Sequence, residues 1–410
     1  MGKDAMMNGA NALERLECLE HAFSNLSIKM EFALHRNKIY QKMLEDLSLE
    51  FLRLKLSGTS QKHIDVKNVK SVFVNREYTG LFSSFNYILD LLHIIFDAEV
   101  HVFPYKTENI DFDLACIVGF KDGYENMRLF MSAIKRNRSV LFVEDGLVSC
   151  ILPISKNGKE KYKKPHSLLL DSMGAYYDAY HPAELEMELN SAEELTDEQR
   201  ERAKRLIDTL VANKITKYNH QPIHKVDIGK RAKKVLIVDQ VWGDASIDYG
   251  MATDDTFRVM LEAAIKENPD ADIIIKTHPD TNGTFHRRHY SEVPDGVYKI
   301  DYDINPYSLL EAVQKVYVCT SQMGFEALLC GKEVHAFGMP FYAGWGVTID
   351  AQTCDRRTRT RTLEDIFYMT YIRHTRYVSY ETQSTCELED TIRELISLRD
   401  EYFAEYNMDS

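Results

Sequence analysis

Thr320-Ser321-Gln322-Met323-Gly324-Phe325-Glu326-Ala327-Leu328-Leu329 is the stretch of sequence that best indicates the fold. An apolar run at residues 316–319 comes directly before it and is typical of a buried strand. The Thr-Ser pair then turns the chain into a helix that begins near Gly324. A helix start leaves backbone N–H groups unpaired and carries the positive end of the helix dipole, so it can bind phosphate. The stretch therefore predicts a strand, a turn and a helix, with an anion site at the turn.

Strands and helices alternate on both sides of this stretch. In the second half of the chain we expect strands at residues 234–238, 272–276, 297–300, 315–319 and 334–337, with helices at 253–267 and 306–314. In the first half we expect strands at 69–75, 99–103, 114–118 and 140–143, with helices at 82–96 and 124–136. Further helices are expected at 193–213, 363–373 and 388–406. Such alternation is typical of parallel sheets covered by helices.

The chain length of 410 residues predicts more than one domain. We expect a helical N-terminal extension at residues 1–65, Rossmann-like domains at 66–222 and 223–350, and a basic loop with helices at 351–410 that packs back across the cleft. A cap on the first domain, a partner-binding hairpin and a short coiled coil are all open interpretations of the extension. This α/β organisation resembles the GT-B fold of glycosyltransferases, in which two sheets face a cleft and the ligand lies beyond the carboxyl ends of the strands.

The composition is that of a soluble globular protein, with 44% hydrophobic and 28% charged residues. The net charge of −13 argues against non-specific nucleic-acid binding, which needs a basic surface. The seven cysteines are dispersed without a C-x-x-C pair, as in reduced cytoplasmic proteins. No secretory signal is recognisable, and the longest apolar stretch, residues 85–96, is too short to span a bilayer. We therefore expect a cytoplasmic protein whose membrane contact, if any, is peripheral.

Acidic residues follow two of the predicted strands. Glu144 comes directly after the strand at 140–143, where burial could raise the pKa of its carboxyl group and let it move protons. The following Asp-Gly pair is also an ordinary turn dipeptide, so a solvent-facing turn is the alternative. Gln240, Asp244 and Ser246 follow the strand at 234–238, and Asp244 and Ser246 are equally good caps for the next helix.

Phosphate-binding residue types follow two other strands. Lys276 and His278 end an all-isoleucine strand and could hold a phosphate and neutralise a leaving group, and Pro279 keeps the backbone extended there. Thr320 and Ser321 add two hydroxyl groups to the helix start described above. Glu326 would repel phosphate and suits the hydroxyl groups of a ribose or another sugar instead.

Two further segments come near the end of the chain. Phe341-Tyr342-Ala343-Gly344-Trp345-Gly346 is rich in glycine and has large aromatic side chains, which suits a loop that closes over a flat, polar ligand. The basic run at residues 356–361 is either a solvated loop or a site that recognises a carboxylate or phosphate through Arg356 or Arg357.

These motifs occur together, in the same order, in a known family that the chain resembles over roughly residues 140–378. The matching strings are Glu-Asp-Gly at 144–146, Gln-x-x-x-Asp-x-Ser at 240–246, Lys-x-His-Pro at 276–279, Thr-Ser-x-x-Gly-Phe-Glu-Ala-Leu at 320–328, Pro-Phe-Tyr-Ala-Gly-Trp-Gly at 340–346 and Asp-Arg-Arg at 355–357. Residues 167–171, 176–178 and 217–219 are also similar to stretches of the family. The family is that of the bacterial retaining β-Kdo transferases of capsule polysaccharide and O-antigen synthesis, where Kdo is a 3-deoxy-octulosonic acid.

The resemblance implies a transferase that moves Kdo from CMP-β-Kdo to an oligosaccharide or lipid-linked glycan, without a metal or other cofactor. Other capsule or O-antigen synthesis proteins are implied as partners, and nucleic acid is not. Retention by double displacement needs a carboxylate nucleophile and an acid/base. Asp244 is then the nucleophile and Glu144 the acid/base, or the reverse, and His278 assists the departure of CMP. The residues implied to bind the donor are Gln240, Ser246, Lys276, Pro279, Thr320, Ser321, Gly324, Phe325, Glu326, Tyr342, Gly344, Trp345, Arg356 and Arg357.

Three alternatives stay open at the level of sequence. A related transferase could use CMP-sialic acid or CDP-glycerol and differ near Trp345 and Arg356. A non-catalytic capsule assembly protein could keep the same fold and bind a nucleotide without turnover. A nucleotide-sugar 2-epimerase would share the two-domain fold, but the aromatic loop at residues 341–346 argues against it.

Overall fold

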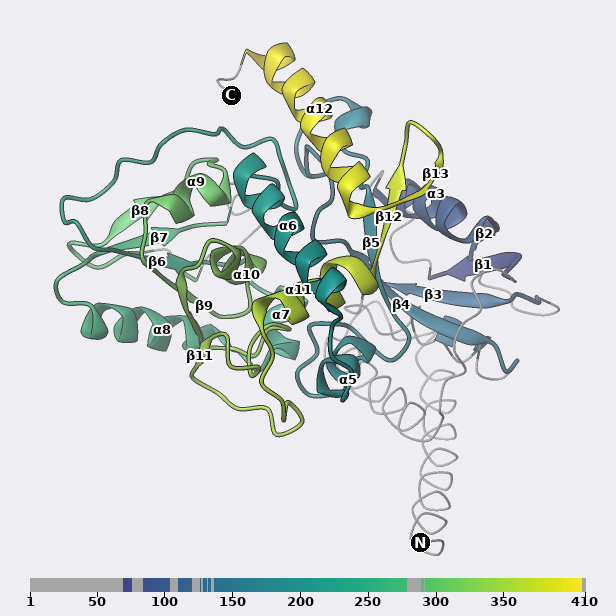
Figure 1. Cartoon of the computed structure of the whole chain (residues 1–410), viewed down its shortest axis with the longest axis horizontal. Coiled ribbons are helices and arrows are strands. Elements are labelled where there is room, and N and C mark those ends of the chain that lie inside the picture. Colours follow the sequence, from purple (N-terminus) through teal and green to yellow (C-terminus); the bar gives the residue numbers. More distant parts are fainter. Residues whose placement is uncertain are drawn as a thin grey trace, which may run out of the picture. The chain divides into compact units, whose positions relative to one another are not determined.

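A computed structural model describes residues 69–75, 84–103, 110–119, 126, 128–130, 132–133, 136–278, 289–290 and 292–407. The predicted N-terminal helical extension and Pro279 lie outside these residues. The chain divides into two compact units, the first ending at Val143 and the second comprising residues 86–95 and 144–410. Figure 1 labels the helices and strands of both. Every candidate site residue that the structure describes belongs to the second unit.

The first unit contains parallel strands in the order β4-β3-β1-β2. The bounds are β1 Ser71–Val74, β2 Glu99–Val102, β3 Leu114–Val118 and β4 Ser139–Asp145, whose last two residues lie in the second unit. β3 is buried at every position, as expected for an apolar strand inside a parallel sheet. The aromatic rings of Phe73, Phe103 and Phe112 pack together against this sheet.

The second unit contains a six-stranded parallel sheet in the order β11-β10-β9-β6-β7-β8. Its strands are β6 Lys234–Val238, β7 Asp272–Lys276, β8 Tyr298–Ile300, β9 Lys315–Val318, β10 Glu333–Ala336 and β11 Ile349–Asp350. The helices between them are α7 Ala245–Tyr249, α8 Asp254–Glu267, α9 Pro306–Glu311 and α10 Gln322–Leu329. The carboxyl ends of β6, β7 and β9 therefore meet at one edge. This edge carries the predicted site residues that follow these strands, which begin at Gln240, Lys276 and Thr320.

The second unit also holds antiparallel strands and several helices. β12 (Thr375–Ser379) pairs antiparallel with both β5 (Ser167–Asp171) and β13 (Ser384–Cys386). Within this unit the strand order is β13-β12-β5. The remaining helical elements are α3 Ser84–Phe96, the 3₁₀ turn η2 Glu160–Tyr162, α5 Glu184–Asn190, α6 Asp197–Asn213, α11 Leu363–Phe367, the π-helical turn η4 Tyr368–Arg373 and α12 Leu388–Tyr406.

The predicted fold class, α/β with two sheets of mostly parallel strands, is confirmed. The strands at 234–238 and 272–276 and the helix at 388–406 have the predicted bounds. The helix expected at 363–373 is instead α11 followed by η4. β5, β12 and β13 were not expected from the sequence.

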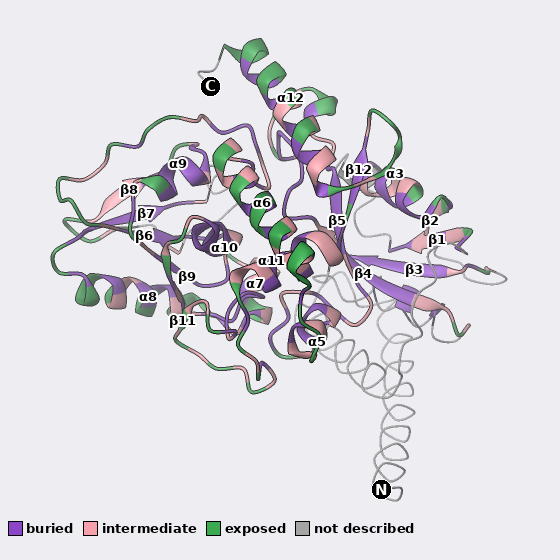
Figure 2. Ribbon diagram, viewed as in Figure 1, coloured by how far each residue is buried: buried purple, intermediate pink, exposed green. Residues whose placement is uncertain are grey.

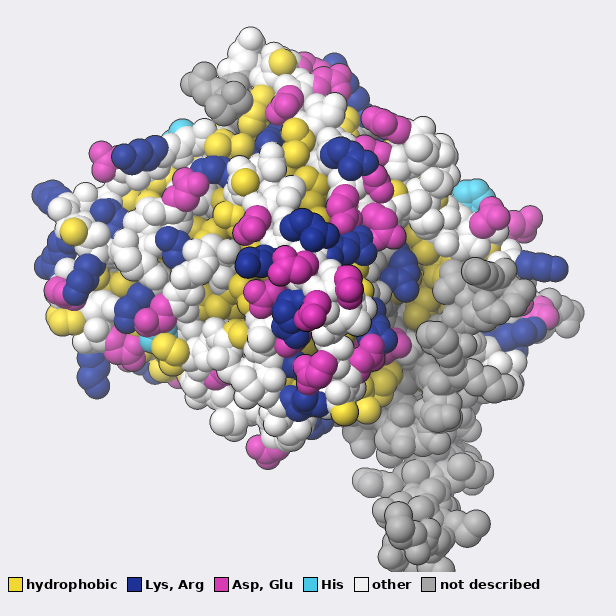
Figure 3. All heavy atoms as spheres, in the orientation of Figure 1, with side chains coloured by type: hydrophobic (Ala, Val, Ile, Leu, Met, Phe, Trp, Pro, Cys, Tyr) yellow, Lys and Arg dark blue, Asp and Glu magenta, His cyan; other side chains and the backbone are white. Residues whose placement is uncertain are grey.

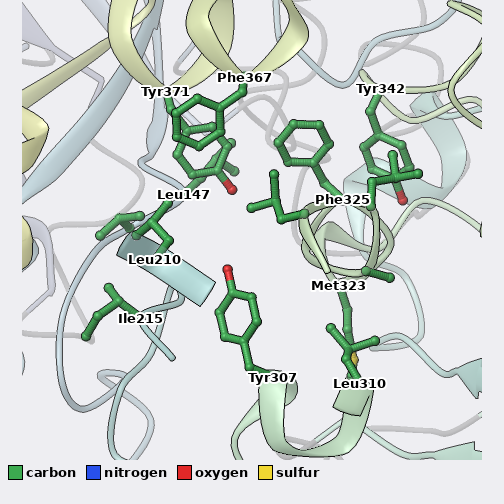
Figure 4. Close-up of a cluster of buried hydrophobic side chains, with 14 of the residues drawn as sticks. Leu147, Leu210, Ile215, Tyr307, Leu310, Met323, Phe325, Tyr342, Phe367 and Tyr371 are labelled. Atoms are coloured by element: carbon green, nitrogen blue, oxygen red, sulfur yellow. The ribbon is translucent and has the colours of Figure 1, made fainter. Parts of the chain in front are cut away.

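The core of the second unit is centred on α10, which is buried along most of its length (Figure 2). Figure 4 shows Phe325 of this helix between Tyr342 and Tyr371, and the ring centroids are 5.6 and 5.7 Å from that of Phe325. Tyr371 in turn stacks on Phe367 at 4.6 Å. Aromatic contacts of this kind fix the position of α10, and therefore of its N-terminus, relative to the π-helical turn.

Basic and acidic side chains interleave on the surface over α5, α6 and α11 (Figure 3). Several of them form ion pairs, such as Arg359 with Glu194 at 2.6 Å and Arg373 with Glu193 at 3.1 Å. These pairs are partly exposed, so each contributes at most about 1 kcal/mol.

Candidate active site

Glu144 stands near the carboxyl end of β4, where its side chain is half-buried. The Tyr177 hydroxyl donates a hydrogen bond of 2.9 Å to Glu144 Oε1. Burial raises the pKa of Glu144 to about 7, and the negative charges of Asp145 and Asp244 add to this rise. The Tyr177 hydrogen bond and the Lys217 ammonium oppose it, because both favour the charged carboxylate. A carboxyl group with a pKa near neutral can take up and release a proton at physiological pH.

Lys217 is the cation of this cluster. Its Nζ lies 3.9 Å from Asp145 Oδ2 and 5.7 Å from the centroid of the Tyr218 ring. The buried Asn219 side chain fixes the turn that carries Lys217, since Nδ2 donates to the Cys150 carbonyl at 3.0 Å. Burial lowers the pKa of Lys217, but the neighbouring acidic groups outweigh burial and raise that pKa above its usual range. The ammonium group therefore stays charged beside the two carboxylates.

Asp244 is a helix cap whose charge also acts on Glu144. It is the N-cap of α7, and its Oδ1 accepts a 2.8 Å hydrogen bond from the Ser246 backbone N–H. Its charge also contributes to the raised pKa of Glu144. The capping interpretation of the sequence is thus confirmed, and the same carboxylate belongs to the electrostatic cluster. Its assignment as the nucleophile stays a prediction.

Gln240, Ser246 and Thr320 form one hydrogen-bonded group at the ends of β6 and β9. Gln240 Nε2 donates to Thr320 Oγ1 at 2.9 Å, and Gln240 Oε1 accepts from the Thr320 backbone N–H at 2.9 Å. The Ser246 hydroxyl lies 3.3 Å from Thr320 Oγ1. Because Gln240 is buried and bonded on both sides of its amide, it holds the Thr-Ser turn in place.

A cavity of about 160 Å³ opens beside this group, and we call it the strand-end cavity. Its lining includes Asp239 after β6, residues 276–278 at the end of β7, the N-cap Ser321 and Glu326 of α10, and residues 216–218, 220 and 221 of the loop that carries Lys217. The volume is about ten times the roughly 10–15 Å³ that one water molecule needs. The structure thus brings four predicted residues, Lys276, His278, Ser321 and Glu326, to one cavity, and Lys217 connects it to the carboxylate cluster.

Lys276 and Glu326 are both buried at this cavity. Lys276 Nζ donates to the carbonyl groups of Thr277 at 2.8 Å and Tyr302 at 3.1 Å. Glu326 Oε1 accepts hydrogen bonds from the Thr216 hydroxyl and from Gln322 Nε2. Burial raises the pKa of Glu326 to about 7, although the two hydrogen bonds act to lower that pKa. The two side chains give the cavity a donor group and a group that can be neutral or negative near physiological pH.

The N-terminal turn of α10 is set by Ser321, Gly324 and Tyr342. Ser321 is the N-cap and accepts from the Met323 backbone N–H at 3.2 Å. The Tyr342 hydroxyl donates to the Ser321 carbonyl at 2.6 Å. A Cβ atom at Gly324 would lie 2.1 Å from the Tyr342 hydroxyl oxygen, so only glycine allows this close approach. Gly324, Phe325 and Tyr342 thus shape the turn from within the core.

The model of the capsule polysaccharide biosynthesis protein family matches residues 115–382. The chain belongs to this family. It is 39% identical over 249 residues to the capsule polysaccharide modification protein LipA of Neisseria meningitidis serogroup B, an alignment that covers 57% of this chain and 35% of LipA. It is 36% identical over 274 residues to the lipopolysaccharide-processing protein LpsZ of Rhizobium meliloti, covering 64% and 60% of the two chains. The chain thus matches about a third of the length of LipA and three-fifths of LpsZ.

Solved structures also resemble this capsule biosynthesis family member. The structure of Thermosulfurimonas dismutans KpsC, β-Kdo 2,4 transferase, is 33% identical, with a TM-score of 0.70 and coverage of 80% of this chain and 98% of that one. The structure of Thermosulfurimonas dismutans KpsC, β-Kdo 2,7 transferase, is 24% identical with a TM-score of 0.58, which shows the shared fold. The neighbours are glycosyltransferases, and the fold of this family member is a glycosyltransferase fold.

The aromatic loop of this family member lies in the core. Trp345 is 1% exposed, and its Nε1 donates to the Phe341 carbonyl at 2.9 Å. Gly344 has a φ of +81° and its backbone N–H donates to Asp350 Oδ2 at 2.9 Å. We expected this loop to close over a ligand, but its aromatic rings are buried in the protein. Burying these apolar rings is more favourable than leaving them exposed to water. The assignment of Gly344 and Trp345 to donor binding stays a prediction.

The arginines of the basic run are bonded to neighbouring groups of the protein and are not simply solvated. Arg357 is buried, and its NH1 donates to the carbonyl groups of Pro340 at 2.6 Å and Ala343 at 2.7 Å. Arg356 and Arg357 both pair with Glu186, at 2.7 and 3.1 Å. These arginines hold the aromatic loop against α5, and their assignment to donor binding also stays a prediction.

Among the described residues, no group of three or more His, Cys, Asp or Glu side chains is placed to hold a metal ion. The chain has an Asp-x-Asp string at residues 301–303. Its Asp303 carboxylate pairs with Lys156 and lies 3.7 Å from His220 Nε2. His220 and Lys156 keep the pKa of the Asp303 carboxyl well below its usual range.

No helix within the described ranges is long and apolar enough to cross a membrane.

Sequence reasoning missed several residues of the site. Tyr177 and Lys217 lie in stretches that resemble the family, and that resemblance was the only signal for them. Gln221 and Asp239 line the strand-end cavity without any motif. Asp239 directly follows β6 and could have been found as the first polar residue after an apolar strand.

Proposed function

We propose that this protein is a retaining β-Kdo transferase, which moves Kdo from CMP-β-Kdo to a glycan or glycolipid in bacterial capsule or lipopolysaccharide O-antigen synthesis. The observation that carries the proposal is the 33% identity to a β-Kdo 2,4 transferase along 98% of that chain. The family membership and the electrostatic influence of Asp244 on Glu144 support it.

In the proposed first step, a carboxylate oxygen of Asp244 attacks the anomeric carbon of Kdo. The bond from that carbon to the phosphate oxygen breaks, and CMP leaves with the electron pair. His278 and Lys276, together with the N-terminus of α10 at Ser321, bind the phosphate whose charge increases as CMP departs. The product of this step is a covalent glycosyl-enzyme.

In the proposed second step, an acceptor hydroxyl displaces Asp244 from the same carbon. Glu144 takes the proton of that hydroxyl, which its pKa of about 7 allows at physiological pH. Two inversions at one carbon restore the β-configuration, so the configuration is retained. No step of this scheme uses a metal ion.

The acceptor is proposed to be an oligosaccharide or a lipid-linked glycan, and the natural partners to be other capsule or O-antigen synthesis proteins. A lipid-linked acceptor would bring the protein to the inner face of the inner membrane as a peripheral protein. Both statements follow from the proposed reaction.

The test is mass spectrometry of the intact protein after incubation with CMP-β-Kdo generated in situ, without an acceptor. We expect a mass increase of one Kdo unit that disappears with Asp244→Ala. Glu144→Gln should still form the adduct but turn over an acceptor slower by about 10²-fold or more, as expected for loss of a general base.

Two results would contradict the scheme in different ways. An adduct that persists in Asp244→Ala would reject Asp244 as the nucleophile, and Glu144→Ala would then test the reverse assignment. Absence of both an adduct and free CMP would reject CMP-β-Kdo as the donor, and thermal shift with CMP and CDP would then identify the nucleotide.

A further inference from the structure

The loop between β5 and α5 carries Tyr177, the hydrogen-bond partner of Glu144. A turn forms its centre, because the Asp178 backbone N–H donates to the Ala175 carbonyl at 2.9 Å. The buried Asp178 carboxylate in turn accepts from the Tyr180 backbone N–H at 2.8 Å. Tyr177 therefore stands inside a short, closed turn, and the position of its hydroxyl depends on what holds the residues that follow.

Arg356 holds the two residues after this turn. Its Nη2 donates to the Ala179 carbonyl at 2.8 Å, and its Nη1 donates to the Tyr180 carbonyl at 3.0 Å. Its Nε and Nη2 also donate to the Glu186 carboxylate of α5, at 2.7 and 3.2 Å. These bonds use four of the five N–H groups of the guanidinium. One planar side chain thus ties two consecutive carbonyl groups of the loop to α5.

The same loop segment is joined to α7. The Ala179 backbone N–H donates to the Tyr249 carbonyl at 2.8 Å, and the Tyr249 ring centroid lies 6.2 Å from that of Tyr177. Tyr249 ends α7, the helix whose N-cap is Asp244. Ala179 is therefore bonded through its N–H to the helix of the proposed nucleophile and through its carbonyl to Arg356. Without Arg356, the carbonyl side of this residue loses its charged partner.

We propose that Arg356 is a positioning residue for the second step of the proposed reaction, because it holds the Tyr177 hydroxyl at hydrogen-bonding distance from Glu144. It acts through the backbone of the loop and not by contact with the reacting atoms. The inference rests on the proposed function, since it takes Glu144 to be the base. It differs from a role of Arg356 in donor binding, which would affect the first step instead.

The effect on Glu144 has a definite sign. The Tyr177 hydrogen bond favours the charged carboxylate, which is the form that accepts a proton, so a looser loop should raise the pKa of Glu144. Loss of the Arg356 charge would also disfavour a carboxylate directly, and the experiment has to separate this effect from the one through Tyr177. The other groups whose charges interact with Glu144 are Asp145, Tyr176, Lys217 and Asp244.

The experiment follows the decay of the Kdo adduct in water by mass spectrometry of the intact protein, after gel filtration has removed the donor. A water oxygen attacks the anomeric carbon, Asp244 leaves with the electron pair of its bond, and Glu144 takes the proton of the water. Because the donor is no longer present, a role of Arg356 in donor binding would not change this rate. The decay is measured from about pH 5 to 9, a range that spans the titration of the proposed base.

Arg356→Met should slow the decay about 3- to 10-fold at about pH 6, the range expected for a weakened hydrogen bond to a charged group. At about pH 9 the rate should be similar to that of the wild-type protein, because Glu144 is then charged in both proteins. In a Tyr177→Phe background, Arg356→Met should cause no further change, since the bond through which it acts is already absent.

The matched control is Arg359→Met, in the same basic run. Arg359 and Arg356 have similar side-chain exposure, 34% and 35%, and Arg359 also bonds a carbonyl group and a glutamate, Ser191 at 2.5 Å and Glu194 at 2.6 Å. Its adduct should decay as the wild-type adduct does. Thermal unfolding shows whether each variant is folded, and Arg356→Gln replaces Arg356→Met if the latter is not.

Three results would overturn this inference alone. In the first, the wild-type adduct forms and Arg356→Met leaves its decay unchanged. In the second, the decay slows by the same factor at every pH, as a general structural defect would cause. In the third, Arg356→Met displaces the pH profile equally with and without the Tyr177 hydroxyl, so the lost charge acts directly. If the wild-type protein forms no adduct, the proposed function itself fails.

Discussion

At the scale of single residues, the site depends on side chains whose charge is set by their neighbours. Glu144 is an example, because burial raises its pKa to about 7 while Tyr177 and Lys217 stabilise its charged form. Its usefulness as a base at neutral pH depends on these opposing effects. The acidic and basic groups that act on Glu144 are Tyr177, Asp145, Lys217 and Asp244.

Tyr177→Phe tests this balance. Removing the hydroxyl removes a hydrogen bond that favours the Glu144 carboxylate, so the pKa of Glu144 should rise further. Since the proposed base acts in its charged form, the acidic limb of the pH profile of transfer should move to higher pH. Activity lost at neutral pH should largely return in more alkaline buffer.

The control for this prediction is Tyr176→Phe. The Tyr176 ring packs against the Tyr177 ring at 5.3 Å, but the bond to Glu144 comes from Tyr177. The acidic limb should stay in place in this variant. Equal profiles for Tyr177→Phe and the wild-type protein would show that Glu144 is not the titrating base.

At the scale of secondary-structure elements, the apolar pattern predicted what lies inside the parallel sheets. β7, with three consecutive isoleucines, and α12, with its helical spacing, were both placed correctly. β5, β12 and β13 were not. β12 and β13 form a short antiparallel hairpin, and β12 pairs with β5, which lies far away in the sequence, so no local alternation of strands and helices marks them. Glu144 and Lys276 could be predicted because they stand at the ends of apolar strands. Tyr177 and Gln221 lie in irregular loops, where no periodicity indicates which way a side chain points.

Gly324→Ala tests how α10 is packed. Alanine favours a helix over glycine by up to about 1 kcal/mol. The added Cβ would lie 2.1 Å from the Tyr342 hydroxyl oxygen and 2.9 Å from Val318 Cγ2, and overpacking of this kind costs about 1–3 kcal/mol or more. We therefore expect a net loss of stability in urea unfolding and weaker nucleotide binding at the displaced helix start.

Gly174→Ala is the matched control, since a Cβ there meets only the Pro182 carbonyl, at an ordinary 3.6 Å. Its free energy of unfolding should change little. If Gly324→Ala were as stable as the wild-type protein, the close packing of Tyr342 on α10 would not be needed to hold the turn.

At the scale of the whole molecule, the buried carboxyl groups predict how stability depends on pH. The fold raises the pKa of Glu326 from 4.5 to about 7, so the folded state binds the proton more tightly than the unfolded chain does. The stability linked to Glu326 is therefore fully present below about pH 4.5 and is lost as the pH rises toward 7, by up to roughly 3 kcal/mol. Glu326→Gln should flatten the fall of the melting temperature between about pH 5 and 7.

The control is Glu201→Gln, on the exposed face of α6. Its melting temperature should depend on pH in the same way as that of the wild-type protein. A wild-type curve with no downward slope in this range, or a Glu326→Gln curve with an unchanged slope, would show that Glu326 ionises in the folded state as it does in the unfolded chain.

The antiparallel pairing of β12 with β5 has a consequence during synthesis on the ribosome. Leu169 of β5 lies opposite Thr375 of β12. The edge of β5 therefore stays unpaired until β12, which is translated much later, leaves the ribosome. Until then the nascent chain exposes an unpaired strand edge, the kind of surface at which unfinished chains associate with one another. A premature stop before residue 375 would leave that edge permanently open, and such fragments should accumulate as aggregates although they contain the whole six-stranded sheet.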